Sequence, residues 1–283
     1  MKIAPHSAAP RLLRLLALLP LFGLIAQPLR AATDPLQPPG TEAYAYRRVG
    51  AVSLSLYVFK PAGWKPGDRR PALVWFFGSG GKPANGVGWA NWATNLGLVA
   101  VTPDYREKAR FTTTRKDTIA DARAAVRWLE DHAAELGIDP QRVVVSGNSA
   151  GGCLALWTAI GHSPPGSEPA ESPLVKPAAL ILTSASSDTS WDTGLQDPQA
   201  YSPVHQLDAK MPPVLLFHGD VDEAVPYRTA VALHDKLAAA GNSCELITIP
   251  QGTHSYAGHA PAWWPRTLEI SRWFLEDQKL ISK

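Results

Sequence analysis

Polar and apolar positions alternate in one short early segment of the chain. Residues 52–58 place Val, Leu, Leu and Val at every second position, with Ser or Tyr between them. This period of two predicts a half-buried strand near one edge of a sheet. The later apolar segments do not alternate, and such continuous runs are typical of strands buried on both faces of a parallel sheet. They lie at residues 72–77, 98–102, 142–146, 179–183, 214–217 and 245–249.

Helical patterns separate most of these predicted strands. The clearest covers residues 116–136, with Ile119, Val126 and Leu129 on one stripe, charged residues on the other, and Gly137 as the predicted stop. Further helices are predicted at residues 150–160, 227–240 and 262–276. Strands that alternate with helices predict an α/β fold with a mostly parallel, doubly wound sheet. In such a sheet the ligand crevice lies beyond the carboxyl ends of the strands.

The first 32 residues have the layout of a secretory signal peptide. Lys2, Arg11 and Arg14 precede an apolar stretch at residues 15–26, and small residues follow at Ala31 and Ala32. The apolar stretch is shorter than the about 20 residues that a membrane-spanning helix needs. We therefore predict an exported protein, periplasmic or secreted, whose residues 33–283 form a single catalytic domain. An uncleaved membrane anchor is the alternative.

Charge narrows the range of partners. The chain has 27 basic and 25 acidic residues, and loss of the four basic residues of the leader changes the formal net charge from +2 to −2. A near-neutral domain with interspersed charges lacks the basic face that binds nucleic acid or an anionic membrane. We expect no nucleic-acid partner and no stable membrane association once the leader is removed.

The two cysteines, Cys153 and Cys244, are too few for a disulfide scaffold. We expect two free, buried thiols, with a disulfide between them as the alternative. The spacing of Cys and His residues does not resemble a metal site. We therefore expect neither a metal nor a cofactor.

The strongest chemical signal is Gly147-Asn148-Ser149-Ala150-Gly151, which stands between a predicted strand and a predicted helix. This G-x-S-x-G pattern is typical of a sharp strand-to-helix turn that lifts a nucleophilic serine out of the sheet. A glycine-rich turn without chemistry is the alternative. The strand and helix on either side favour Ser149 as a nucleophile.

A serine nucleophile needs a base and an acid from elsewhere in the fold. Most of the eight histidines lie in the leader, in predicted helices or in loops. His254 follows the last predicted strand at the carboxyl edge, with His259 as its competitor. The strand before it ends near three acids, Asp220, Asp222 and Glu223, and the order serine, acid, histidine is that of an α/β-hydrolase triad. The spacing leaves the acid open.

Acyl transfer also needs N–H donors for the developing oxyanion. One donor is expected from Ala150, the residue after the nucleophile, and the others from the glycine-rich loop at residues 77–81, which follows an early strand. A flexible hairpin is the alternative for that loop.

Motifs along residues 52–276 resemble the exported esterase/lipase branch of the α/β-hydrolases. This branch includes hormone-sensitive-lipase-like acetyl esterases and the acetyl and feruloyl esterases that act on carbohydrates. The motifs that carry the resemblance are Asp104-Tyr105-Arg106, Gly137-Ile138-Asp139-Pro140, the Gly-x-Ser-Ala-Gly-Gly of residues 147–152, Tyr201-Ser202-Pro203, His218-Gly219 to Val225-Pro226, and Gly252-Thr253-His254.

The resemblance implies an α/β-hydrolase fold with a mostly parallel, eight-stranded, doubly wound sheet and helices on both faces. The second aspartate of the family's H-G-x-x-D-x-x-V-P pattern is its triad acid, which implies Asp222. Asp220 is then expected to cap a turn, Glu223 to be solvated and His218 to be structural. The family's H-G-G-G loop reads Phe-Gly-Ser-Gly at residues 77–80, a departure that puts the oxyanion donors on Ser79 and Gly80, beside Ala150.

We expect a carboxylic ester hydrolase that works through an acyl-enzyme on a small-molecule or polysaccharide-linked ester. Residues 184–211 contain no amphipathic helix for a cap, which favours an open site and short acyl groups such as acetyl or feruloyl. Trp89, Trp92, Trp191 and Tyr256 are expected to be either pocket walls or core.

Other functions remain as alternatives. They are an amidase of the kynurenine-formamidase type, a secreted lipase, an inactive binding module, and a peptidase of the prolyl-peptidase type, which usually carries a propeller that 283 residues do not accommodate.

Overall fold

The computed structural model describes residues 1, 34–166, 176–190, 197–256 and 262–283. The predicted signal peptide, Trp191 and His259 lie outside the described residues, apart from Met1. The chain divides into the units Met1–Asp34 and Pro35–Lys283, and all the elements below belong to the second. None of the described helices is long and apolar enough to cross a membrane.

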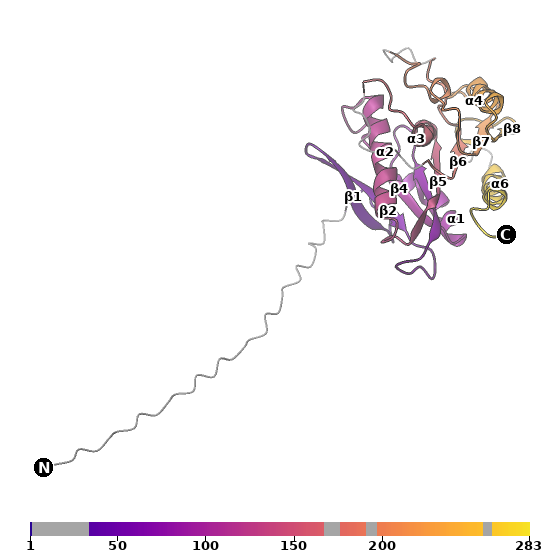
Figure 1. Ribbon diagram of the computed structural model, residues 1–283. Coiled ribbons are helices and arrows are strands. Elements are labelled where there is room, and N and C mark those ends of the chain that lie inside the picture. The colour runs from indigo at the N-terminus through magenta and orange to yellow at the C-terminus, as the bar shows by residue number, and fades with distance from the viewer. Residues whose placement is uncertain (2–33, 167–175, 191–196, 257–261) are drawn as a thin grey trace. The chain divides into compact units, whose positions relative to one another are not determined.

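Eight strands form one sheet in the order β1-β2-β4-β3-β5-β6-β7-β8 (Figure 1). The first two pairings, β1 with β2 and β2 with β4, are antiparallel, and all the others are parallel. The strands are β1 (Glu42–Val49), β2 (Val52–Phe59), β3 (Arg70–Phe76), β4 (Val99–Pro103), β5 (Ile138–Asn148), β6 (Ala179–Thr183), β7 (Val214–Gly219) and β8 (Cys244–Ile249). The predicted α/β-hydrolase sheet is confirmed.

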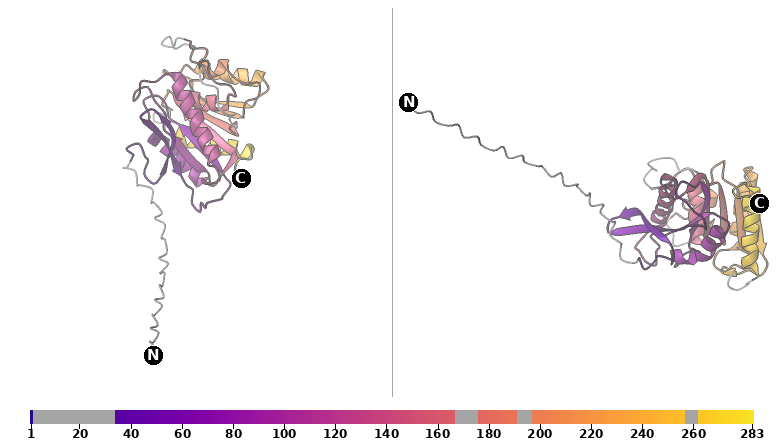
Figure 2. Two further views of the ribbon diagram at one scale, coloured as in Figure 1. Left: turned by 60° about the vertical axis from the view of Figure 1, so that its left-hand side comes forward. Right: turned by 90° about the horizontal axis from the view of Figure 1, so that it is seen from below.

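Helices cover both faces of the sheet (Figure 2). On one face, α2 packs on α3, α3 contacts β5, and α4 contacts β7 and β8. On the other face, α1 contacts β3 and β4, and α6 contacts β7. Trp89 of α1 meets Trp264 of α6 edge to face, with ring centroids 5.4 Å apart. The helices are α1 (Val87–Asn95), α2 (Arg115–Asp131), α3 (Ala150–Ala159), α4 (Tyr227–Ala239) and α6 (Trp263–Asp277), with 3₁₀ turns η1 (Pro83–Gly86) and η2 (Pro203–His205).

Two elements were not predicted from the sequence. The edge strand β1 has only a short alternating pattern, with a bulge between Ala45 and Arg47, and β2 lies just inside it. Helix α1 contains Gly88, Asn91 and Asn95, which are poor helix formers. Its helical state comes from burial of Trp89, Ala90 and Ala93 against the sheet.

Helix α2 departs from its prediction in length and in its polar face. It ends at Asp131, and Gly137 lies six residues further on, in a left-handed turn that leads into β5. The stripe of Ile119, Val126 and Leu129 is fully buried, as predicted. Asp121, on the polar stripe, is buried too, because it pairs with Arg106 at 2.8 Å and with Arg47 at 3.0 Å. Those pairs tie α2 to the loop after β4 and to β1.

The cysteines are free among the described residues, as expected, but only one is fully buried. Cys153 lies inside α3, whereas Cys244, at the start of edge strand β8, is partly exposed because no further strand covers it. Burial raises the pKa of the Cys153 thiol, so it stays protonated.

The start of α3 lies closer to the sheet than any side chain would permit. A Cβ at Gly151 would lie 2.1 Å from the Phe76 carbonyl oxygen, and one at Gly147 would lie 2.3 Å from the Gly151 carbonyl carbon. A Cβ at Gly152 would meet the Cβ of Ala185 at 2.5 Å. These glycines therefore allow the helix to begin directly above the strand ends.

This packing predicts that Gly151→Ala lowers the free energy of unfolding by more than about 3 kcal/mol, because its Cβ would meet backbone atoms that cannot move aside. Urea denaturation followed by circular dichroism measures the change. Gly88→Ala in α1 is the control, since its Cβ would meet only the edge of the Trp264 side chain at 3.2 Å. Equal stability of the two variants would show that α3 can shift without cost.

Candidate active site

Ser149 occupies a strained turn between β5 and α3. Its φ of 54° and ψ of −119° lie in a region that non-glycine residues rarely adopt, as expected for a nucleophile elbow. Its N–H donates to the Thr183 carbonyl at 3.0 Å, and its carbonyl accepts from Ser186 at 3.0 Å and from Cys153 at 3.2 Å. The backbone is thus held on both sides. The hydroxyl has no hydrogen-bond partner among the described residues, and the contact with a general base often forms only when substrate binds.

The loop after β3 lies beside Ser149. A Cβ at Gly78 would stand 3.1 Å from the Ser149 Cβ. The Gly81 N–H donates to the Gly78 carbonyl at 3.0 Å and closes a turn in which Gly80 has a φ of +72°. Among the described residues, the N–H groups of Ser79, Gly80 and Ala150 have no acceptor. The three predicted donors are therefore available to a substrate oxygen.

Phe77, which replaces the histidine of the related motif, anchors this loop through its ring and its carbonyl. The ring is fully buried and stacks on Tyr105, with centroids 4.2 Å apart and planes at 16°. The Tyr105 hydroxyl donates to the Phe77 carbonyl at 2.8 Å. Arg110 pairs with Asp104 and lies over the Phe77 ring at 5.9 Å from its centroid. Tyr105 and, through Arg110, Asp104 therefore support the loop after β3.

Asp222 and His254 meet across the ends of β7 and β8. The His254 Nδ1 lies 2.9 Å from one carboxylate oxygen of Asp222 and 3.0 Å from the other. Both loops can approach because Gly219 and Gly252 touch: a Cβ at Gly219 would lie 2.0 Å from the Gly252 carbonyl oxygen. Both of these contacts use Nδ1, so the second ring nitrogen of His254, Nε2, does not contact the carboxylate.

His218 was expected to be only structural, and the structure makes it a partner of the same carboxylate. It is fully buried at the end of β7, with Nε2 3.1 Å from Asp222 Oδ2 and 2.9 Å from the Val225 carbonyl oxygen. Both neighbours accept, so Nε2 carries a proton and donates. The i, i+4 spacing of His218 and Asp222 within the H-G-x-x-D motif was the signal in the sequence.

Asp222 remains ionised because its donors outweigh its burial. Burial alone would raise the pKa of this carboxyl group, but hydrogen bonds from His218, His254 and the Val225 N–H hold the pKa well below its usual value. The Ala224 N–H donates to Oδ1 as well, at 2.9 Å. A permanent carboxylate at this position can fix the tautomer of His254.

The neighbouring acids have other roles than those expected. Among the described residues, Asp220 is exposed and its side chain caps no N–H; Asp222 caps the turn instead, through Ala224 and Val225. Glu223 is exposed but not merely solvated, since it accepts from the His254 N–H at 3.2 Å. It therefore holds the backbone of the histidine loop.

The end of β6 joins the serine and histidine loops. Thr183 accepts the Ser149 N–H, and the next residue, Ser184, donates its hydroxyl to the His254 carbonyl at 3.2 Å. Ser184 is fully buried and has a φ of 44°. The two chemistry-bearing loops are thus fastened to consecutive residues of one strand end.

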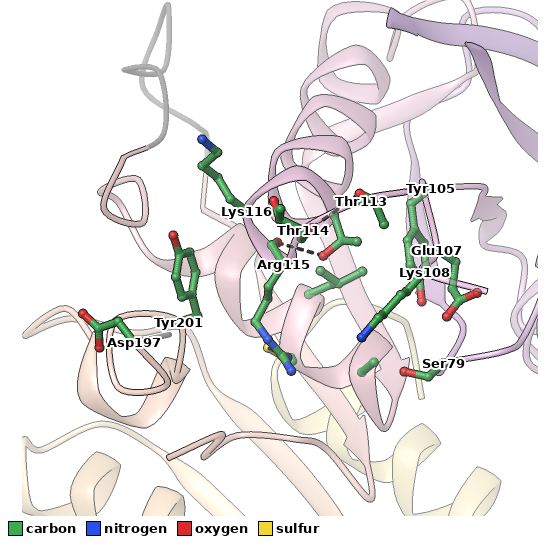
Figure 3. A pocket seen from close by; sticks show the side chains of 14 residues that line it. Ser79, Tyr105, Glu107, Lys108, Thr113, Thr114, Arg115, Lys116, Asp197 and Tyr201 are labelled. Atoms are coloured by element: carbon green, nitrogen blue, oxygen red, sulfur yellow. Dashed lines mark hydrogen bonds between the residues drawn. The ribbon is translucent and has the colours of Figure 1, made fainter. Parts of the chain in front are cut away.

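Two cavities border the turn at Ser149, since Asn148 before the serine lines one of them and Ala150 after it lines the other. One of about 680 Å³, which we call the His254 cavity, is lined by His254 and Asn148, by the loop glycines and by Trp75, Trp89, Trp264 and Tyr256. The other, of about 590 Å³, is called the Arg115 cavity and is lined by Ala150, Cys153 and Leu154 with polar residues that include Lys108 and Arg115 (Figure 3). Ser79 borders both. Trp89 and Tyr256 are therefore pocket walls as well as core.

From the segment of residues 184–211, Asp197 and Tyr201 line the Arg115 cavity. Within the described residues, His, Cys, Asp and Glu side chains form no group of three or more that could hold a metal ion. The site's chemistry rests on a strained serine, an imidazole–carboxylate pair and unbonded N–H groups.

Comparisons with known proteins place these residues in a family context. Residues 90–279, more than half of the chain, match the model of the prolyl oligopeptidase family. The esterase LipQ of Mycobacterium tuberculosis is 26% identical over 218 residues, which are 68% of this chain and 51% of LipQ. Lipase 2 of a Moraxella species is 41% identical over 63 residues, 22% of this chain and 14% of that lipase. The chain spans about half or less of the length of these curated relatives.

Among solved structures, the chain resembles a thermophilic esterase from Thermogutta terrifontis. The propionate-bound form gives a TM-score of 0.80 and 35% identity over 88% of this chain and 98% of that chain. Esterase 2 of the same organism, phosphoramylated by tabun, gives a TM-score of 0.80 and 37% identity over 87% of this chain and 97% of that chain. The similarity therefore extends over nearly the whole esterase.

The contact between His218 and Asp222 predicts that His218→Leu lowers the kcat for 4-nitrophenyl acetate by about tenfold or more, with KM little changed. Removal of a hydrogen bond to a charged group costs about 1.5–3 kcal/mol, and Asp222 would hold His254 less firmly. His218→Gln retains a donor and should recover much of the rate. Equal losses in both variants, with native circular dichroism, would limit His218 to a packing role.

Proposed function

Because this chain belongs to the prolyl oligopeptidase family of the α/β-hydrolase superfamily, we propose that it is a serine carboxylic ester hydrolase with Ser149 as nucleophile, His254 as general base and Asp222 as the orienting acid. One observation carries the proposal. The neighbours of the strained Ser149 line two cavities, one of which is also lined by His254, the partner of Asp222, and unbonded N–H groups lie beside the serine.

In the proposed mechanism, His254 accepts the Ser149 hydroxyl proton as the oxygen attacks the ester carbonyl. The N–H groups of Ala150, Ser79 and Gly80 stabilise the oxyanion. The C–O bond to the alcohol then breaks, His254 gives its proton to the leaving oxygen, and an acyl-enzyme remains. Water, deprotonated by His254, attacks this ester, releases the acid and restores Ser149.

An ester is favoured over a peptide as the substrate, although the family name refers to a peptidase. The solved relatives at 35–37% identity are esterases, and they match nearly their whole length. Amide hydrolysis by the same residues is the second candidate, supported by the family match. A comparison of 4-nitrophenyl acetate with 4-nitroacetanilide separates the two, because only an amidase would cleave the anilide at a comparable rate.

A short acyl group on a ring-shaped alcohol is the substrate class that we propose. The Thermogutta terrifontis esterase has been solved with propionate and with butyrate bound. The described parts of residues 184–211 contain η2 but no α-helix that could form a cap. Aromatic walls formed by Trp89, Trp264 and Tyr256 suit a sugar or aryl alcohol. The leader pattern of residues 1–32 supports export, where acetylated or feruloylated polysaccharides are encountered.

The assignment of the nucleophile predicts that Ser149→Ala loses about 10⁴-fold or more in kcat for 4-nitrophenyl acetate. Its structure should persist, since the side chain is small and partly exposed. Labelling by a fluorophosphonate probe should also disappear, and Ser186→Ala, altered at a nearby buried serine, is the matched control. Retention of labelling in Ser149→Ala would assign the nucleophile elsewhere.

The open, polar surroundings predict that kcat/KM falls as the neutral acyl chain lengthens beyond butyryl. Each buried methylene is worth about 0.8 kcal/mol, so a lipase-like tunnel would gain several-fold with each added carbon. Polar side chains line much of the Arg115 cavity and offer an alkyl chain little such gain. Rates on 4-nitrophenyl esters from acetate to octanoate test this expectation. A steady rise to octanoate would instead identify a lipase.

A further inference from the structure

The proposed mechanism, on which this inference rests, assigns the two halves of the substrate to the two cavities. His254 must protonate the leaving oxygen, so the alcohol lies on the side of His254, in the cavity that this residue lines. The acyl group points to the other side of Ser149. Ala150 and Ser79, which carry oxyanion donors, open there into the Arg115 cavity. The walls of that cavity therefore select the acyl group.

Those walls carry positive charge. In Figure 3 the Lys108 ammonium and the Arg115 guanidinium both point toward the side of the cavity where Ser79 lies. Lys116 borders the same cavity but points away, and its ammonium donates to the Gly166 carbonyl at 2.9 Å. Two cations thus face the position of the acyl chain. A bare alkyl chain there would displace water from charged groups without replacing its hydrogen bonds.

The acids of this cavity do not neutralise Lys108. Glu107 is 5% exposed and accepts the Ala109 N–H at 2.8 Å. Asp197 accepts the Ala200 N–H at 3.1 Å and lies at the far side of the cavity (Figure 3). Within the part of the chain that the structure describes, Lys108 forms no ion pair. Its charge is therefore available to a ligand.

We propose that the Arg115 cavity binds an acyl group that ends in a carboxylate, with Lys108 as the residue that pairs with it. The preferred acyl donors are then half-esters of short dicarboxylic acids such as succinate. The ester carbonyl occupies the oxyanion site between Ser79 and Ala150, and the distal carboxylate meets the ammonium of Lys108, an exposed residue on the wall of the same cavity. Lys108 is a specificity residue, distinct from the residues that cleave the ester.

The test compares methyl hydrogen succinate with methyl butyrate, which has an acyl chain of the same length without the charge. Initial rates are measured in a pH-stat on the mature chain, at low and high salt. We expect the ratio of kcat/KM values to favour the succinate by at least about fivefold in the wild type and to decline in high salt. Lys108→Met should abolish this preference, and Lys108→Arg should keep it. Lys116→Met, the matched control, should leave it at the wild-type ratio.

The outcomes separate this inference from the proposed function. Hydrolysis of methyl butyrate with no preference for succinate, or equal ratios in Lys108→Met and Lys116→Met, would overturn the carboxylate site alone. Failure to hydrolyse either ester, together with no fluorophosphonate labelling of Ser149, would overturn the proposed function and this inference with it.

Discussion

The glycine-mediated contact between α3 and the ends of β3 and β5 is the constraint on which the site depends. Because a Cβ at Gly151 would lie 2.1 Å from the Phe76 carbonyl oxygen, the helix can start above the strands only with glycine there. The chain must then turn within one residue, which forces Ser149 to a φ of 54° at a cost of about 1–3 kcal/mol. The same turn leaves the Ala150 N–H unbonded at the positive end of a helix. One packing contact therefore exposes the proposed nucleophile and orients an N–H donor toward the charge that its attack would create.

A second glycine contact positions the proposed acid and base. Gly219 and Gly252 press the loops after β7 and β8 together, so Asp222 and His254 can reach each other across neighbouring strands. The carboxylate would be destabilised by burial, and its donors compensate: two imidazoles and two backbone N–H groups. Glu223 and Ser184 hold the backbone of His254 from either side. The loops after β7 and β8 are thus held in place partly by hydrogen bonds from residues outside the proposed triad.

The sequence predicts the groups that lie in local motifs and misses those that depend on packing. Ser149 and the parallel strands follow from patterns of a few residues, and the structure has the predicted sheet. The choice of Asp222 over Asp220 needed the family resemblance, since both follow the same strand. The i, i+4 spacing of His218 and Asp222 was a signal for their contact, but the contact of Glu223 with the His254 N–H could not be read from spacing, because it depends on how the β7 and β8 loops fold against one another. Helix α1 and strand β1 were missed for the same reason, as burial by distant segments outweighs weak local preference.

The departure at Phe77 shows how a substituted motif can keep its geometry. A histidine at the start of such a loop could anchor it through its side chain, whereas here the anchor is the backbone carbonyl, bonded by Tyr105. The two rings stack, so the aromatic side chain adds packing instead of a polar contact. Burial raises the pKa of Tyr105, and its hydroxyl therefore keeps its proton and continues to donate throughout the neutral range. An imidazole in that position would change charge near neutral pH. The oxyanion loop is held by groups that do not titrate there, which leaves His254 as the group in this site whose protonation the proposed chemistry uses.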